Sequence, residues 1–136
     1  MLNSLALCAG LALSISPAPK NPAQEIRLWP VEQRVIQHTN AQRAMYGLPA
    51  LAVDQNLVNS ARRHAIWMTR ARSMVHTNMP VGENIAMGQS SSSEVVRDWM
   101  NSSGHRANIL NRGYSRIGVA AFHAPDGTTF WCQQFQ

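Results

Sequence analysis

The chain of 136 residues has room for one domain, and its 45% hydrophobic residues suffice to bury a core, which excludes a disordered chain. The net charge of +5 comes almost entirely from arginines scattered between Arg27 and Arg116. The sequence contains no zinc finger, aromatic RNA-binding strand or long basic tail, so the charge indicates a solvated basic face suited to an anionic cell surface. A nucleic-acid-binding protein is not expected.

The N-terminal residues predict export. The apolar run from Leu5 to Leu13 is shorter than the roughly 20 residues that cross a bilayer, and it fits the core of a signal peptide. We assign residues 1–18 to this signal and expect a secreted or periplasmic protein without a transmembrane helix. Two alternatives stay open: a hydrophobic helix packed on the domain, and a lipoprotein anchored at Cys8. Cys132, on an apolar strand, is expected to be a small buried hydrophobe.

The next segment leads into the domain. Residues 19–30 are rich in proline and polar side chains and predict a linker, after which one domain fills residues 31–136. A first helix is expected from Val31 to Tyr46, because Pro30 suits a helix start and Gly47 a helix end.

A second helix follows an extended link at residues 48–51. Asp54 is its predicted N-cap, since an aspartate side chain can accept from the free N–H groups of the first turn. Helical spacing places four apolar residues on the face expected to be buried: Leu57, Ala61, Ala65 and Met68.

A third helix and a further helical turn are predicted after residue 90. Ser91 and Glu94 form a capping-box pattern at the start of the helix. Ser102 or Ser103 is expected to cap the next turn, which runs to Leu110. The inward face of the third helix is expected to carry Val95, Val96, Trp99 and Met100.

The end of the chain changes to a strand pattern. Ile117–Phe122 and Thr128–Phe135 flank a turn at residues 125–127 and predict a β-hairpin. A third strand is expected over Glu83–Met87. Helices followed by a hairpin indicate an α+β fold.

Four sequence patterns occur in order along the domain. They are Asn40-Ala41-Gln42-Arg43 with Gly47-Leu48-Pro49-Ala50-Leu51, His76-Thr77 with Gly82-Glu83-Asn84-Ile85-Ala86, the segment from Trp99 to Leu110, and Ile117-Gly118-Val119 with Phe130-Trp131. Together they resemble the CAP superfamily, which includes cysteine-rich secretory proteins, insect venom antigens and pathogenesis-related plant proteins. They are most similar to its short bacterial SCP-like members. The resemblance implies an α-β-α sandwich with a three-stranded antiparallel sheet between helices.

The resemblance also implies a cleft of His76, Glu83, Ser102 and His105. The two histidines of the family map onto His76 and His105 and its first glutamate onto Glu83, whereas its second glutamate falls on Ser102. Two imidazoles beside a carboxylate suit a divalent metal such as Zn²⁺, which we expect to bind weakly through His76 and His105. The dipole of the following helix should favour the neutral form of His105. Alternatively, Glu83 and the histidines form a buried network that ties the helices to the sheet.

Three functions remain open on the sequence. The leading hypothesis, by fold analogy, is an exported, monomeric binding module whose cleft takes a lipid, an envelope component or a partner protein. The alternative is a metal-dependent hydrolase, with His76 and His105 on the metal and Glu83 as the candidate catalytic residue that polarises water. The serine at position 102 counts against it. The third possibility is an inert exported scaffold.

Other polar residues are expected to be structural. Arg43, Asn84 and Asn108 should form structural hydrogen bonds. His64 is expected to be packed in the core, and His38 and His123 to lie on the surface or in loops.

Overall fold

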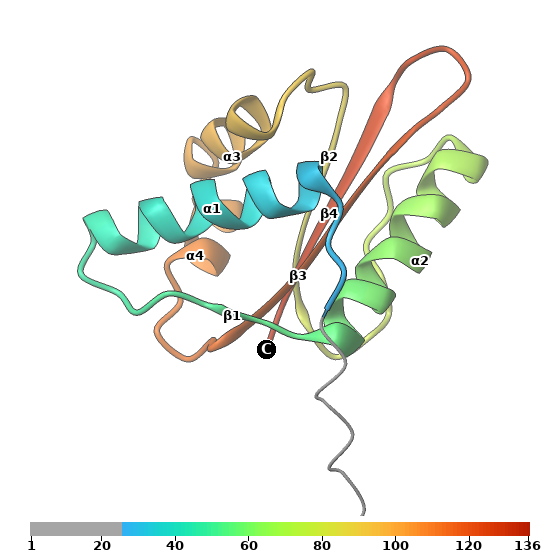
Figure 1. Cartoon of the computed structure of the whole chain (residues 1–136). Coiled ribbons are helices and arrows are strands. Elements are labelled where there is room, and N and C mark those ends of the chain that lie inside the picture. The colour runs from blue at the N-terminus through green and yellow to red at the C-terminus, as the bar shows by residue number, and fades with distance from the viewer. Residues whose placement is uncertain (1–25) are drawn as a thin grey trace, which may run out of the picture.

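The computed structural model describes residues 26–136 (Figure 1). The predicted signal peptide, Cys8 and most of the predicted linker lie outside this range. No helix in residues 26–136 is both long enough and apolar enough to cross a membrane. The elements in chain order are α1 (Pro30–Met45), β1 (Ala52–Val53), α2 (Gln55–Ala71), β2 (Gly82–Met87), α3 (Ser92–Met100), α4 (Ser103–Ile109), β3 (Arg116–His123) and β4 (Thr129–Phe135).

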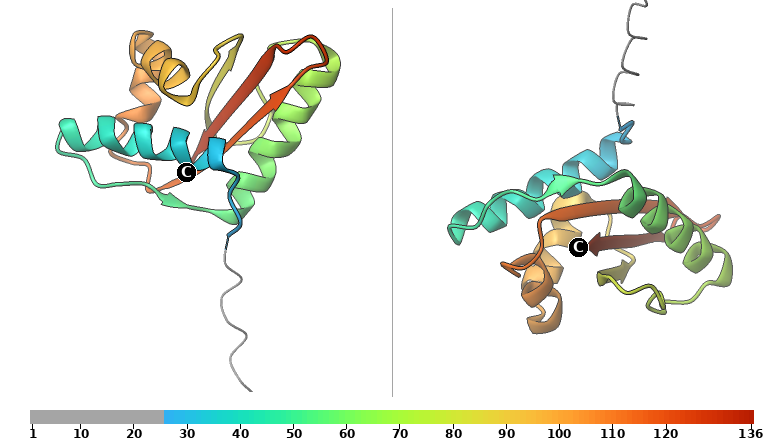
Figure 2. Two further views of the ribbon diagram at one scale, coloured as in Figure 1. Left: turned by 45° about the horizontal axis from the view of Figure 1, so that its top comes forward. Right: turned by 90° about the horizontal axis from the view of Figure 1, so that it is seen from below.

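The predicted α-β-α sandwich is confirmed. Figure 1 and the left view of Figure 2 show α2 on one side of the sheet and α1, α3 and α4 on the other. Each side has its own hydrophobic core, because successive side chains of a strand point to opposite faces. Trp99 and Trp131 lie in the core under α1 and α3, whereas Ile85, Cys132 and Phe130 pack against α2.

The sheet has one strand more than the three predicted. Its order is β1-β3-β4-β2, and β2, β4 and β3 form the expected antiparallel set. The additional strand β1 pairs in parallel with β3, where Ala52 lies opposite Arg116 and Val53 opposite Ile117. The predicted extended link ends directly before it. A strand of two residues is too short to show the alternation of apolar and polar residues by which strands are predicted.

The helix starts confirm most of the predicted caps. The Asp54 carboxylate accepts from the N–H groups of Asn56 (2.8 Å) and Leu57 (3.0 Å), as predicted. The Ser91 hydroxyl accepts from the N–H of Glu94 (3.2 Å). In a capping box the Glu94 carboxylate would accept from the N–H of Ser91. Here it accepts instead from the N–H (2.8 Å) and hydroxyl (2.7 Å) of Ser90.

Two other helix starts differ in detail. Ser102 is at the N-cap position of α4, but its side chain forms no capping hydrogen bond. Pro30 is already part of α1, so the helix begins one residue earlier than expected. The N–H of Trp29 is satisfied by the Glu32 carboxylate at 2.8 Å.

Arg43 connects α1 to two loops from inside the protein. It is 1% exposed, and its guanidinium donates to four backbone carbonyls, those of Pro49, Ile109, Asn111 and Tyr114. Burial lowers its pKa. The guanidinium is always charged in proteins, so these carbonyls replace the water that it loses on folding. The predicted structural hydrogen bonding of Arg43 is confirmed.

The contact between α2 and β3 depends on Gly118. A Cβ atom at this position would overlap the backbone of Leu57 and Val58 in the first turn of α2. Its neighbour on the same face of the strand, Ala120, is also small and fully buried. The helix can therefore lie directly on the sheet. This close contact fixes the distance between the side chains of α2 and those of the strands.

We expect Gly118→Ala to lower the free energy of unfolding by about 1–3 kcal/mol, because a backbone contact cannot give way as a side chain can. The matched control is Gly104→Ala in α4, where a new Cβ would meet nothing within 4 Å. Alanine should stabilise that helix by about 0.5–1 kcal/mol. Urea unfolding of both variants measures the difference. Equal stabilities of the two variants would show that α2 does not rest on Gly118.

Candidate functional site

The candidate site is built around β2, which is an edge strand of the sheet. Two consecutive residues of this strand, Glu83 and Asn84, are both buried and polar. Since their side chains point to opposite faces of the sheet, that of Glu83 lies on the side of α2 and that of Asn84 on the side of α1 and α4. Each is the centre of a separate hydrogen-bond network.

The Glu83 carboxylate is held by groups from two directions. Its Oε1 lies 2.8 Å from Nδ1 of His76 and accepts from the N–H of Thr77 at 2.9 Å. Its Oε2 accepts from Nε2 of Gln134 at 2.9 Å and from the thiol of Cys132 at 3.6 Å. The side chain of Glu83 is only 4% exposed, whereas that of His76 is 59% exposed. The carboxylate is thus a buried acceptor that fixes a largely exposed imidazole.

The charge state of this centre follows from its contacts. Burial raises the pKa of the Glu83 carboxyl, but the hydrogen bonds from Gln134, Thr77 and His76 and the nearby His64 outweigh burial and lower the pKa overall. Glu83 is therefore ionised at neutral pH and can only accept. It follows that Nδ1 of His76 carries a proton and that Nε2 is the free nitrogen of the neutral ring. Burial, and then the charge of Glu83, raise the pKa of the Cys132 thiol, which stays protonated.

His64 also belongs to this centre. Its side chain is mostly buried, as expected for a packed histidine, but its Nε2 lies 3.9 Å from Oε2 of Glu83. The same nitrogen lies 2.7 Å from the carbonyl oxygen of Val75, and the ring stacks on Trp67 with 5.8 Å between centroids. Sequence reasoning missed this residue. Its helical neighbours Ala61 and Ala65 indicated a core position and gave no sign that Glu83 lies beside it.

On the other face, Asn84 and Asn108 hold α4 against β2. Asn84 Nδ2 donates to the carbonyl of His105 (3.1 Å) and to Gln133 Oε1 (3.1 Å). Asn108 Nδ2 donates to the Glu83 carbonyl (3.1 Å) and to Asn84 Oδ1 (2.9 Å). These bonds confirm the predicted structural use of both asparagines, and they fix the turn of α4 that carries His105.

His105 is biased toward its neutral form. Burial lowers its pKa, and the nearby imidazole of His76 lowers it further. The direction agrees with the prediction, but the cause is different: the prediction relied on the helix dipole, whereas desolvation and a second imidazole produce the shift. His76 and His105 are therefore close enough to influence each other electrostatically.

The predicted cleft residues come from three segments: the loop before β2, β2 itself, and the start of α4 with the residue before it. A hollow of about 420 Å³ lies beside His76 and is lined by His64, Trp67, Val75, His76, Thr77 and Asn78. Glu83 is buried next to His76, whereas His105 lies in α4 and Ser102 directly before that helix. The structure therefore connects His76 directly to Glu83 and links His105 to them through the asparagines of β2 and α4.

Of the four predicted cleft residues, only His76 and His105 are available as metal ligands. In the described part of the chain, no three His, Cys, Asp or Glu side chains are grouped as ligands of a metal ion. Both oxygens of Glu83 already accept hydrogen bonds, so it is not available as a third ligand. A carboxylate that accepts from Nδ1 of a histidine is the usual partner of a metal-binding imidazole, because it directs Nε2 outward. His76 has this arrangement.

Comparison with known proteins agrees with this architecture. The sequence model of the cysteine-rich secretory protein family, CAP, matches residues 36–135. The uncharacterized protein YkwD of Bacillus subtilis is 36% identical over 121 residues, which cover 76% of this chain and 46% of YkwD. This chain therefore spans less than half the length of that relative.

Solved structures show the same fold. An extracellular protein containing an SCP domain from Bacillus anthracis is 27% identical, with a TM-score of 0.67 over 80% of this chain and 44% of that protein. An outer surface protein from Borrelia burgdorferi has a TM-score of 0.70 at 21% identity, over 76% of this chain and 89% of that protein. By its family match, its relatives and its fold, the chain belongs to the cysteine-rich secretory protein (CAP) family, in the short SCP-like form of bacteria.

Proposed function

We propose that this protein is an extracytoplasmic binding module whose site beside His76 takes a lipid, an envelope component or a partner protein. The observation that carries the proposal is the state of Glu83. Its carboxylate is the candidate catalytic group of the site, yet it is 4% exposed and accepts hydrogen bonds at both oxygens. It is thus suited to holding His76 and the loop before β2 in place beside the hollow.

The same observation counts against a metal-dependent hydrolase. Such an enzyme would need Glu83 to reach a water molecule and take up its proton. A carboxylate that is 4% exposed and engaged by His76, Thr77 and Gln134 offers little oxygen surface for this step. Ser102, in the place of the second glutamate of the family, cannot act as a general base. Binding therefore has better support than catalysis.

The proposed location outside the cytoplasm rests on two observations. The apolar run near the N-terminus has the length of a signal core. The Bacillus anthracis protein of the same fold is described as extracellular. The net charge of +5 would suit contact with an anionic cell surface.

The binding proposal predicts that a specific molecule copurifies with the protein. Mass spectrometry of extracts from the purified whole chain should find a molecule that Thr77→Trp, which would obstruct the hollow beside His76, no longer retains. The matched control is Gln37→Trp, at an exposed site of α1 on the opposite side of the sheet (Figure 1). Equal retention by the two folded variants, or no retained molecule in the parent, would contradict binding in this hollow.

The metal proposal concerns weak binding of Zn²⁺ between Nε2 of His76 and His105. Zinc at pH 7.5 should raise the melting temperature of the parent in a dose-dependent manner, because a ligand of the folded state stabilises it. His76→Ala and His105→Ala should abolish the rise. Glu83→Gln should lower the zinc affinity by about 10–100-fold, so that a given rise needs more zinc. The matched control His38→Ala, at an exposed site on α1, should respond like the parent.

The zinc response should also depend on pH. Protons compete with the metal for imidazole nitrogens, so the response should fade below about pH 6. His105, whose pKa is lowered by burial, stays neutral to a lower pH than an exposed histidine and should not be the first ligand lost. Identical melting curves of the parent with and without zinc at pH 7.5 would disprove the metal site.

A further inference from the structure

The exposed face of α2 carries a stripe of basic and apolar side chains. Arg63, Ile66, Trp67 and Arg70 are spaced i, i+3, i+4 and i+7, which places them on one side of the helix along about 10 Å. We call these four residues the α2 stripe. The buried residues of the helix lie on the opposite face, at Leu57, Val58, Ala61, Ala65 and Met68.

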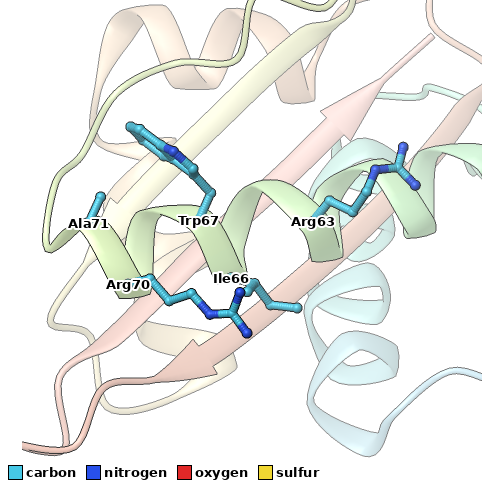
Figure 3. Close-up of a pocket in the computed structure, with 5 residues that line it drawn as sticks. All are labelled: Arg63, Ile66, Trp67, Arg70 and Ala71. Carbon is cyan, nitrogen blue, oxygen red and sulfur yellow. The ribbon is translucent and has the colours of Figure 1, made fainter.

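The stripe borders a shallow surface rather than a deep cavity. A hollow of about 550 Å³ is lined by the four stripe residues and Ala71. Figure 3 shows the stripe residues along α2, with Trp67 pointing toward one edge of the stripe and Ile66 and Arg70 toward the other. Trp67 also lines the hollow that contains Val75, and Arg63 lines a third hollow that contains Met79. The apolar surface thus extends from the helix onto the loop before β2.

The apolar members of this surface are half exposed. Relative exposure is 48% for Trp67, 49% for Val75 and 50% for Met79. A cluster of large apolar side chains in water is a feature of surfaces that meet another apolar phase or a partner.

The stripe arginines differ from the other arginines nearby. Arg62 pairs with Glu32, Arg72 with Asp126 and Arg116 with Asp54. Within residues 26–136, Arg63 and Arg70 form no ion pair with a carboxylate, and α2 itself contains no acidic residue. Their charge is therefore available to an anionic partner.

We propose that the α2 stripe, with Val75 and Met79, docks the protein on an anionic phospholipid membrane. Tryptophan and aliphatic side chains enter the boundary between headgroups and acyl chains, while arginines contact the phosphates above it. A soluble anionic polymer would satisfy the arginines but would leave Trp67, Val75 and Met79 in water. A bilayer satisfies both kinds of group at once.

This docking is independent of what the site beside His76 binds, although Trp67 and Val75 border both surfaces. Docking through the stripe turns the hollow of His64, Trp67 and His76 toward the membrane. Neither Arg63 nor Arg70 lines that hollow. Arg63→Gln/Arg70→Gln should therefore lose vesicle binding but keep the molecule retained beside His76, so the docking proposal and the proposed function can fail separately.

The test is sedimentation of the whole chain with vesicles of equimolar phosphatidylcholine and phosphatidylglycerol, and with vesicles of phosphatidylcholine alone. Because each arginine near an anionic surface contributes about fivefold in affinity, Arg63→Gln/Arg70→Gln should bind the anionic vesicles about 25-fold more weakly than the parent. The matched control is Arg34→Gln/Arg112→Gln, which removes the same charge from exposed sites on α1 and on the loop before β3. It should bind like the parent.

A second measurement follows Trp67 itself. Tryptophan fluorescence of the parent should shift to shorter wavelength with anionic vesicles, and Trp67→Phe should remove the shift. Three results would overturn the proposal: no sedimentation of the parent with anionic vesicles, equal losses in the two double-arginine variants, or an unaltered shift in Trp67→Phe. Every variant retains the apolar N-terminal run, so differences among variants with parental melting temperatures report on the stripe.

Discussion

The site depends on the burial of one carboxylate. Removing Glu83 from water costs several kcal/mol unless its oxygens find donors. The donors are His76 and Thr77 in the loop before β2 and Gln134 and Cys132 in β4. His64 in α2 lies 3.9 Å from Oε2, close enough for an electrostatic contact. The loop, the sheet and the helix must therefore keep their relative positions for the charge to remain satisfied. Because the exposed imidazole of His76 is hydrogen-bonded to this carboxylate, its orientation is fixed as well.

The neighbouring residue extends the same constraint to the opposite face. Asn84 links β2 to Gln133 in β4 and to the carbonyl of His105 in α4, and Gln133 continues to Thr39 in α1 at 2.7 Å. Two consecutive polar residues of an edge strand thus anchor both helical layers. These polar networks add to the apolar packing between the layers and help to specify the positions of the helices on the sheet.

Much of this arrangement could be predicted from the sequence, and the rest depends on contacts between distant segments. Asp54 and Ser91 were identifiable as N-caps because an N-cap bonds only to N–H groups two or three residues further along the chain. The antiparallel strands were identifiable from turn residues and alternation. In contrast, His64 has helical neighbours that indicate a core position, and its approach to Glu83 exists only once α2 lies on the sheet over Gly118. The resemblance to the family identified His76, Glu83 and His105. The sequence around Glu83 could not show that Gln134, from a distant strand, donates to its carboxylate.

The central claim is that Glu83 fixes His76 with Nδ1 protonated and Nε2 free. The most direct measurement is the tautomeric state of His76 at pH 7.5, from the ¹⁵N chemical shifts and long-range proton couplings of its ring in the selectively labelled whole chain. We expect a neutral Nδ1–H tautomer in the parent and loss of that preference in Glu83→Gln. A neutral Nε2–H tautomer in the parent, or a ring whose two tautomers are equally populated with and without the Glu83 carboxylate, would contradict it.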